Sequence, residues 1–110
     1  MTIYYEKIEH VNSSDEEEEV LTISSTREEK KKIRRIIIFA ETNAGILRWY
    51  ISREKIGWHR TGKASIQNGL VFEVGHELEV GDEFKLTLQN KVSGTYAEIY
   101  GVVEYEITAT

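Results

Sequence analysis

Hydrophobic and polar residues alternate along most of the chain from residue 46 onward. The segments with this period of two are 46–55, 70–74, 83–90 and 95–108. In the first of them, Leu47, Trp49 and Ile51 share one face. A period of two is typical of a β-strand that buries one of its faces. Because no segment shows a convincing helical period, we predict seven or eight short strands in a single-domain antiparallel β-sandwich.

Gly, Asn and Asp residues mark the turns between these strands. The β-branched segment 33–42 is separated from 46–55 by Asn43-Ala44-Gly45, which predicts that the two strands pair as a hairpin. Residues 57–69 are expected to be mostly loop. Gly81-Asp82 interrupts two alternating runs, and we expect the Asp82 side chain to cap that turn by accepting hydrogen bonds from backbone N–H groups.

Two of the expected strands, in residues 33–40 and 96–102, carry hydrophobic residues on both faces. A sandwich buries only one face of each sheet, so the second apolar face needs a cover. Two alternatives could bury this second face. The first is a loop or the N-terminal arm of the same chain, and the second is a further subunit. The second alternative predicts a homo-oligomer, and aromatic side chains such as tyrosine suit an interface. The interface residues that it predicts are Ile36, Ile38, Tyr96, Tyr100 and Val102.

Composition narrows the class of protein. The chain has 110 residues, of which 14 are basic and 19 acidic, and its net charge is −5. An acidic balance disfavours nucleic-acid binding, which depends on neutralising phosphates. The absence of cysteine excludes disulfides and thiolate metal sites. Abundant Lys, Glu and Ile favour a thermophilic source. Two charged segments, 12–19 and 26–32, are expected to be loops of this one domain.

Targeting signals are not evident. No apolar run is long enough to span a membrane, and the first ten residues, MTIYYEKIEH, do not follow the pattern of a signal peptide. We therefore expect a cytoplasmic protein, or a virion component assembled in the cytoplasm.

The best candidate for a small-ligand site is the segment around Trp58. Aromatic and basic side chains are crowded there, and such a mixture can stack on a ring while contacting an acidic group. The predicted ligand loop contains Arg53, Trp58, His59, Arg60 and Lys63. The alternative is that Trp58 fills the edge of the core while the cations keep the loop soluble.

The same segment, GWHRTGKA, resembles a phosphate-binding P-loop, G-x-x-x-x-G-K-[ST]. Ala64 stands where that motif has its magnesium-binding Ser or Thr, and no helix is expected to follow. The histidines His10, His59 and His76 lack metal-ligand spacing, and there is no G-x-S-x-G nucleophile motif. We therefore expect no catalytic residue, no metal site, no cofactor and no enzymatic activity.

Residues 69–108 show a resemblance to known proteins. NGLVFEV leads to LEVGDEFKLTL and then to YAEIYGVVEYEI, so a strand, an L-x-x-G-D turn, a strand and a last strand with an internal glycine follow one another. This pattern resembles the C-terminal half of trimeric tumour-necrosis-factor-like jelly rolls and is similar to small jelly-roll structural proteins of viruses and phages.

The resemblance implies a jelly roll that associates through one face, often threefold, and has no active site. With the small size and missing disulfides, it favours a virion capsid, decoration or turret subunit, whose partners are further copies of itself and other capsid or assembly proteins. The alternative function is a carbohydrate-binding or other ligand-binding module that uses the segment around Trp58.

Overall fold

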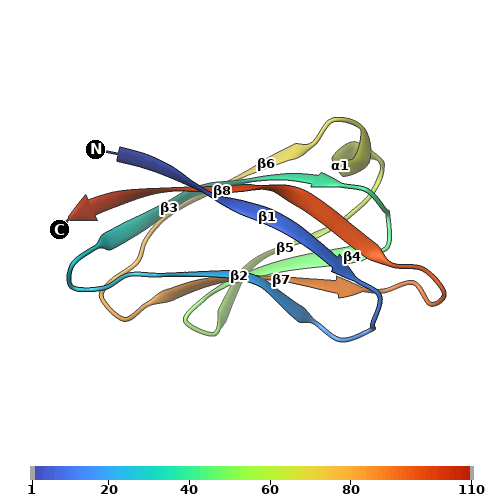
Figure 1. Ribbon diagram of the computed structural model, residues 1–110, viewed down its shortest axis with the longest axis horizontal. Coiled ribbons are helices and arrows are strands. Elements are labelled where there is room, and N and C mark those ends of the chain that lie inside the picture. Colours follow the sequence, from blue (N-terminus) through green and yellow to red (C-terminus); the bar gives the residue numbers. More distant parts are fainter. Residues whose placement is uncertain (1, 110) are drawn as a thin grey trace.

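The computed structural model describes residues 2–109, which form two antiparallel four-stranded sheets packed face to face (Figure 1). The prediction of an all-β sandwich is confirmed. The elements are β1 (Thr2–Asn12), β2 (Glu18–Ser24), β3 (Lys30–Ala40), β4 (Gly45–Ile51), β5 (Glu54–Arg60), α1 (Lys63–Gln67), β6 (Leu70–Glu77), β7 (Glu83–Asn90) and β8 (Ala97–Ala109). Both ends of the chain lie at the same end of the molecule (Figure 1).

The strand order follows a nested pattern. Sheet A has the order β1-β8-β3-β6, and sheet B has the order β2-β7-β4-β5. The first strand pairs with the last, the second with the seventh, the third with the sixth and the fourth with the fifth. Two further pairs, β3 with β8 and β4 with β7, complete the sheets.

The hydrophobic core lies between the two sheets, where the inward side chains of alternating strands meet. β7 contributes Phe84, Leu86 and Leu88, all fully buried, as the period of two in its sequence predicts. β8 contributes Ile99 and Val103 from the opposite sheet. Burying side chains of this size stabilises the fold by roughly 1.5–3 kcal/mol each.

The hairpin predicted for residues 33–42 and 46–55 does not form. β3 belongs to sheet A and β4 to sheet B, so residues 41–44 carry the chain from one sheet to the other. β4 pairs instead with β5 through a two-residue turn, and with β7. The strands on either side of residues 41–44, β3 and β4, have apolar residues on both faces. The local pattern therefore does not distinguish a hairpin within one sheet from a connection that passes from one sheet to the other.

The expectation of loop for residues 57–69 is also wrong in part. Residues up to Arg60 belong to the edge strand β5, and Lys63–Gln67 form a short helix. Gly57 allows β5 to lie close to the core: a Cβ at this position would come within 2.2 Å of the Trp49 ring. The indole therefore packs directly over the backbone of its neighbouring strand.

A bulge in β3 reverses the predicted orientation of its hydrophobic residues. The register of β3 shifts between Ile33 and Arg35 against both β6 and β8. An extra residue in a strand changes which face the following side chains take. Ile36 and Ile38, predicted to lie in a subunit interface, are consequently buried in the core with 1% and 0% of their surface exposed.

The bulge also brings two arginines to the outer face of sheet A. Arg34 pairs with Glu104 and Glu106 at 3.0 and 3.1 Å, and Arg35 pairs with Glu104 at 3.0 Å. The two carboxylates are almost fully buried, with side-chain exposures of 4% and 8%. Buried carboxylates require partners of opposite charge. The two arginines at the bulge therefore balance the charges of the two glutamates on β8.

The charged segments between strands are shorter than expected. The connections cover residues 13–17 and 25–29, because β2 begins at Glu18 and β3 at Lys30. The turn at Gly81-Asp82 agrees with the prediction. The Asp82 carboxylate accepts a hydrogen bond from the Glu79 N–H at 3.1 Å, and Gly81 has a φ of 93°.

Candidate functional site

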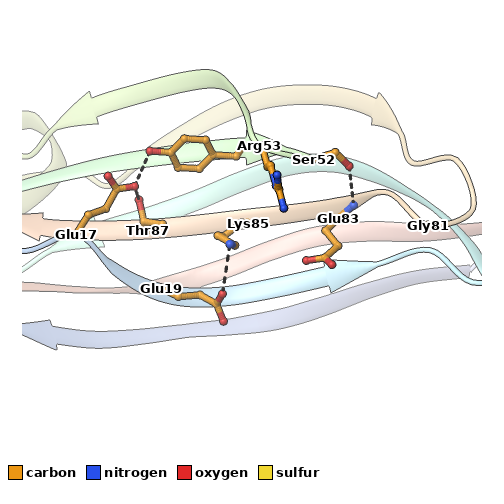
Figure 2. Close-up of a pocket in the computed structure, with 9 residues that line it drawn as sticks. Glu17, Glu19, Ser52, Arg53, Gly81, Glu83, Lys85 and Thr87 are labelled. Carbon is orange, nitrogen blue, oxygen red and sulfur yellow. Dashed lines mark hydrogen bonds and ion pairs between the residues drawn. The ribbon is translucent and has the colours of Figure 1, made fainter.

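A pocket of about 820 Å³ lies on the outer face of sheet B, away from the core. Residues from three neighbouring strands and from three connections surround it (Figure 2). The lining residues are Glu17, Glu19, Tyr50, Ser52, Arg53, Gly81, Glu83, Lys85 and Thr87. The polar positions of β7 at 83, 85 and 87 face this pocket because the residues between them point into the core.

Glu17 closes one end of the pocket and ties the β1–β2 connection to sheet B. Its carboxylate accepts hydrogen bonds from the Tyr50 hydroxyl at 2.5 Å and from the Thr87 hydroxyl at 2.6 Å. Arg48 donates to its other oxygen at 3.3 Å. Figure 2 shows the Glu17 side chain directed at Thr87. Glu17 is therefore not a freely solvated member of the acidic run 15–19.

The environment of Glu17 keeps it ionised. Burial on its own raises the pKa of this carboxyl, but the hydrogen bonds from Thr87 and Tyr50 and the charge of Arg48 outweigh burial and lower the pKa below 4.5. In return, burial and the hydrogen bond to Glu17 raise the pKa of Tyr50 above 10.0. Near neutral pH the pocket therefore has a carboxylate and a phenol at this end.

The opposite end of the pocket is formed by the β4–β5 turn. Ser52 and Arg53 both have positive φ angles, 46° and 80°. The Ser52 hydroxyl donates to the Asp82 carboxylate at 3.1 Å and accepts from the Glu83 N–H at 3.2 Å. These two hydrogen bonds connect the turn to the turn before β7, so the two form one wall.

The charged groups between these ends are only partly paired. Lys85 lies 3.8 Å from Glu19, at the outer limit of an ion pair, and both side chains are about half exposed. Within residues 2–109, the guanidinium of Arg53 and the carboxylate of Glu83 have no hydrogen bond or ion pair. The pocket thus offers one free donor group and one free acceptor group.

Three of the predicted ligand residues lie on β5, and the structure divides them between its two faces. Trp58, with 61% of its surface exposed, and Arg60 point outward on the face that carries the pocket. His59 points inward and packs against Phe72 with ring centroids 5.1 Å apart. Arg53 lines the pocket. The side chain of Lys63 lies outside the described residues.

Trp58 is therefore an exposed strand residue rather than the tip of a loop or a plug of the core. It is the register partner of Arg48, whose side chain contacts Glu17 of the pocket. Sequence reasoning missed Glu17, Tyr50, Lys85 and Thr87. The alternation of β4 and β7 identifies their outward positions, but only the pairing of β2, β7 and β4 brings them together.

A second exposed feature lies on the outer face of sheet A. Ile37 of β3 is the register partner of Val71 on β6 and of Val102 on β8. Beside them, Phe39 stacks on Tyr100 with ring centroids 5.3 Å apart. These five side chains form the apolar patch of sheet A: Ile37, Phe39, Val71, Tyr100 and Val102.

The patch retains only part of the predicted interface. Tyr100 and Val102 belong to it, and Tyr96 is exposed just before β8 begins. Ile36 and Ile38 are replaced by their neighbours Ile37 and Phe39 because of the bulge in β3.

The near P-loop motif does not take the shape of a phosphate-binding loop. The expectation that no helix follows the motif is wrong, because Lys63–Gln67 form the short helix α1. The first four residues of the motif, 57–60, are nevertheless extended in β5, so they cannot wrap a phosphate with their backbone N–H groups. Among residues 2–109, no group of three or more His, Asp or Glu side chains is placed to hold a metal ion. In the same range, no helix has the length and apolar character needed to cross a membrane.

Comparison with protein families finds no matching family model, and comparison with curated proteins finds no match. The candidate functional features of the protein are therefore the pocket on sheet B and the apolar patch on sheet A.

Proposed function

We propose that this protein is a non-enzymatic structural subunit that associates with further copies of itself through the outer face of sheet A. The observation that carries the proposal is the apolar patch of sheet A, in which half-buried and exposed side chains from three adjacent strands lie next to one another on the outer face. Val71 and Tyr100 at its edges are 52% and 44% exposed. Contiguous apolar surfaces of this kind mark interaction sites on soluble proteins.

The size of the face is adequate for a stable interface. The four strands of sheet A contain between 8 and 13 residues. At ~3.3 Å per residue and ~4.8 Å between strands, such a face covers about 700 Å². A standard protein interface buries ~800 Å² on each partner. A second copy of the same face, with its own patch, is the occupant that we propose.

The narrower proposal is a jelly-roll subunit of a virion: a capsid, decoration or turret protein. The nested pairing of β1 with β8, β2 with β7, β3 with β6 and β4 with β5 supports the jelly roll, because this is how a long hairpin wraps into two sheets. Jelly rolls are frequent among capsid proteins, and this analogy of fold supports the virion.

The proposal is tested by the mass of the protein in solution. We expect sedimentation velocity at high micromolar concentration to detect a closed oligomer for the native sequence. The double variant Val71→Glu/Tyr100→Glu should sediment as a monomer, because two charges buried without partners oppose association.

Val80→Glu is the matched control. Val80 is as exposed as Val71 but lies in the β6–β7 connection, so this variant should associate normally. A native protein that remains monomeric, or a double variant that associates as the native protein does, contradicts the proposal.

A further inference from the structure

The outer face of sheet B has a chemistry that differs from that of the patch on sheet A. Its pocket is lined by both carboxylates and cations, and no large aliphatic side chain lines it. A purely apolar ligand would leave these charged groups without water or partners, which costs free energy. A ligand for this pocket must therefore both donate and accept hydrogen bonds.

The free groups specify how such a ligand would bind. Figure 2 shows Arg53 extending from the β4–β5 turn into the pocket, on the side of Lys85 and Glu83. Arg53 donates hydrogen bonds in a planar fork, and the Glu83 carboxylate accepts them. Neighbouring hydroxyl groups on a ring satisfy both, because each hydroxyl is a donor and an acceptor.

The carboxylates argue against a polyphosphate chain. Glu17, Glu19 and Glu83 line the same pocket, and the lowered pKa of Glu17 keeps its negative charge near neutral pH. Phosphate groups placed among these carboxylates would be repelled. The acidic net charge of −5 acts in the same direction.

Trp58 adds an apolar platform beside the pocket. Its indole is 61% exposed on the outward face of β5, in register with Arg48. A flat aromatic ring offers a stacking surface. The apolar C–H face of a sugar ring matches this surface while its hydroxyl groups reach the polar pocket.

The backbone at Arg53 supports a binding role. A φ of 80° is unfavourable for a side chain with a Cβ, and Gly or Asn is the usual choice at such a turn position. Residues held in strained conformations are often found at binding sites. Here the strained residue is the one that directs an unpaired guanidinium into the pocket.

From these observations we propose that the outer face of sheet B binds an oligosaccharide, with one ring stacked on Trp58 and the hydroxyl groups of a ring further along the same glycan bonded by Arg53 and Glu83. This activity is separate from self-association, which uses the opposite face of the sandwich.

The experiment has two stages. Labelled protein is first applied to a printed array of several hundred neutral and acidic glycans, and every glycan that binds is then titrated against ¹⁵N-labelled protein by NMR. We expect at least one glycan to shift the Trp58 indole N–H and the Arg53 Nε–H signals. Trp58→Ala should weaken its binding by roughly tenfold or more, as expected from the loss of one stacked ring. Arg53→Gly should weaken binding to a similar degree.

Tyr5→Ala is the matched control. Tyr5 has the same 61% exposure as Trp58 but lies on β1 of the other sheet, so its loss should leave glycan binding unchanged. Retained amide dispersion in the spectra of each variant shows that it is folded. The proposal is overturned if no glycan on the array binds, if binding survives both Trp58→Ala and Arg53→Gly, or if a single-stranded oligonucleotide binds in place of glycans.

Discussion

Gly101 shows at the residue scale how closely the strands of sheet A pack. It lies in β8 with a φ of 151°, and a Cβ built on it would come within 2.0 Å of the Ile37 carbonyl oxygen. That oxygen belongs to the backbone of the adjacent strand β3, so it cannot move aside without breaking the pairing of the two strands. Only glycine fits this position.

Gly101→Ala should therefore destabilise the protein strongly. We expect its free energy of unfolding to fall by about 2–4 kcal/mol, from steric overlap and backbone strain together. Urea denaturation measures this change. Gly62→Ala is the control, because an added Cβ there meets nothing within 4 Å, and its effect should stay within ~0.5 kcal/mol. Equal effects of the two substitutions would contradict the steric account.

We expect His59 to make the stability of the protein depend on pH. Burial lowers the pKa of His59 below 6.5, and its Nε2 is buried with no hydrogen-bond partner among the described residues. Below pH 6.5 the unfolded chain takes up a proton that the folded protein resists, so stability falls as the pH falls. Because the pKa of Glu17 is lowered from 4.5, its contribution is lost only at more acidic pH.

We expect the free energy of unfolding to decrease between pH 7 and pH 5 in the native protein, and to decrease less in His59→Phe. The phenylalanine keeps the ring contact with Phe72 but cannot be protonated. Denaturation curves at each pH provide the measurement, and His76→Gln, which changes an exposed histidine, is the control. A His59→Phe variant with the native pH dependence would exclude His59 as the source.

At the scale of elements, the β4–β5 hairpin combines a strained turn with the proposed binding role of Arg53. Its two turn residues, Ser52 and Arg53, have positive φ angles, the geometry of the two-residue turns that match the twist of paired strands. The Ser52 hydroxyl donates to the Asp82 carboxylate and accepts from the Glu83 N–H, and these two hydrogen bonds hold the turn in place. The sequence thus retains a residue that strains the backbone at the position where its side chain enters the pocket.

Arg53→Gly should stabilise the protein while it weakens saccharide binding. Relief of the left-handed conformation is expected to raise the free energy of unfolding by about 1 kcal/mol. Arg60→Gly, at the far end of the following strand β5, should lower it by roughly 0.5–1 kcal/mol, since that residue is not strained. Urea denaturation distinguishes the two signs, and a destabilised Arg53→Gly would show that the arginine has another structural role.

At the scale of the whole molecule, the sandwich separates two proposed activities on its opposite outer faces. The core between the sheets is filled by fully buried side chains, so the two faces do not share surface residues. The Val71→Glu/Tyr100→Glu variant should therefore bind glycans as the native protein does, and Trp58→Ala should associate normally. Each proposal can fail in these measurements without affecting the other.

The sequence by itself determined which residues form most of the strands and that they build a sandwich. The period of two in residues 70–74, 83–90 and 95–108 predicts β6, β7 and β8, because the apolar residues of an alternating strand are the ones that one face buries. The turn at Gly81-Asp82 was predictable because its geometry depends on neighbouring residues. Tyr100 and Trp58 are exposed on outward positions of their strands, and Arg53 lines the pocket.

Only the tertiary structure decided which strands pair, which face of β3 enters the core and which residues gather at the pocket. The bulge at Arg34 depends on the register against β6 and β8, so the local pattern misplaced Ile36 and Ile38. Glu17 and Thr87 are 70 residues apart and meet because β2 pairs with β7. Alternation within a strand is a local property, whereas pairing and register arise from contacts between distant segments, and those contacts assemble both proposed sites.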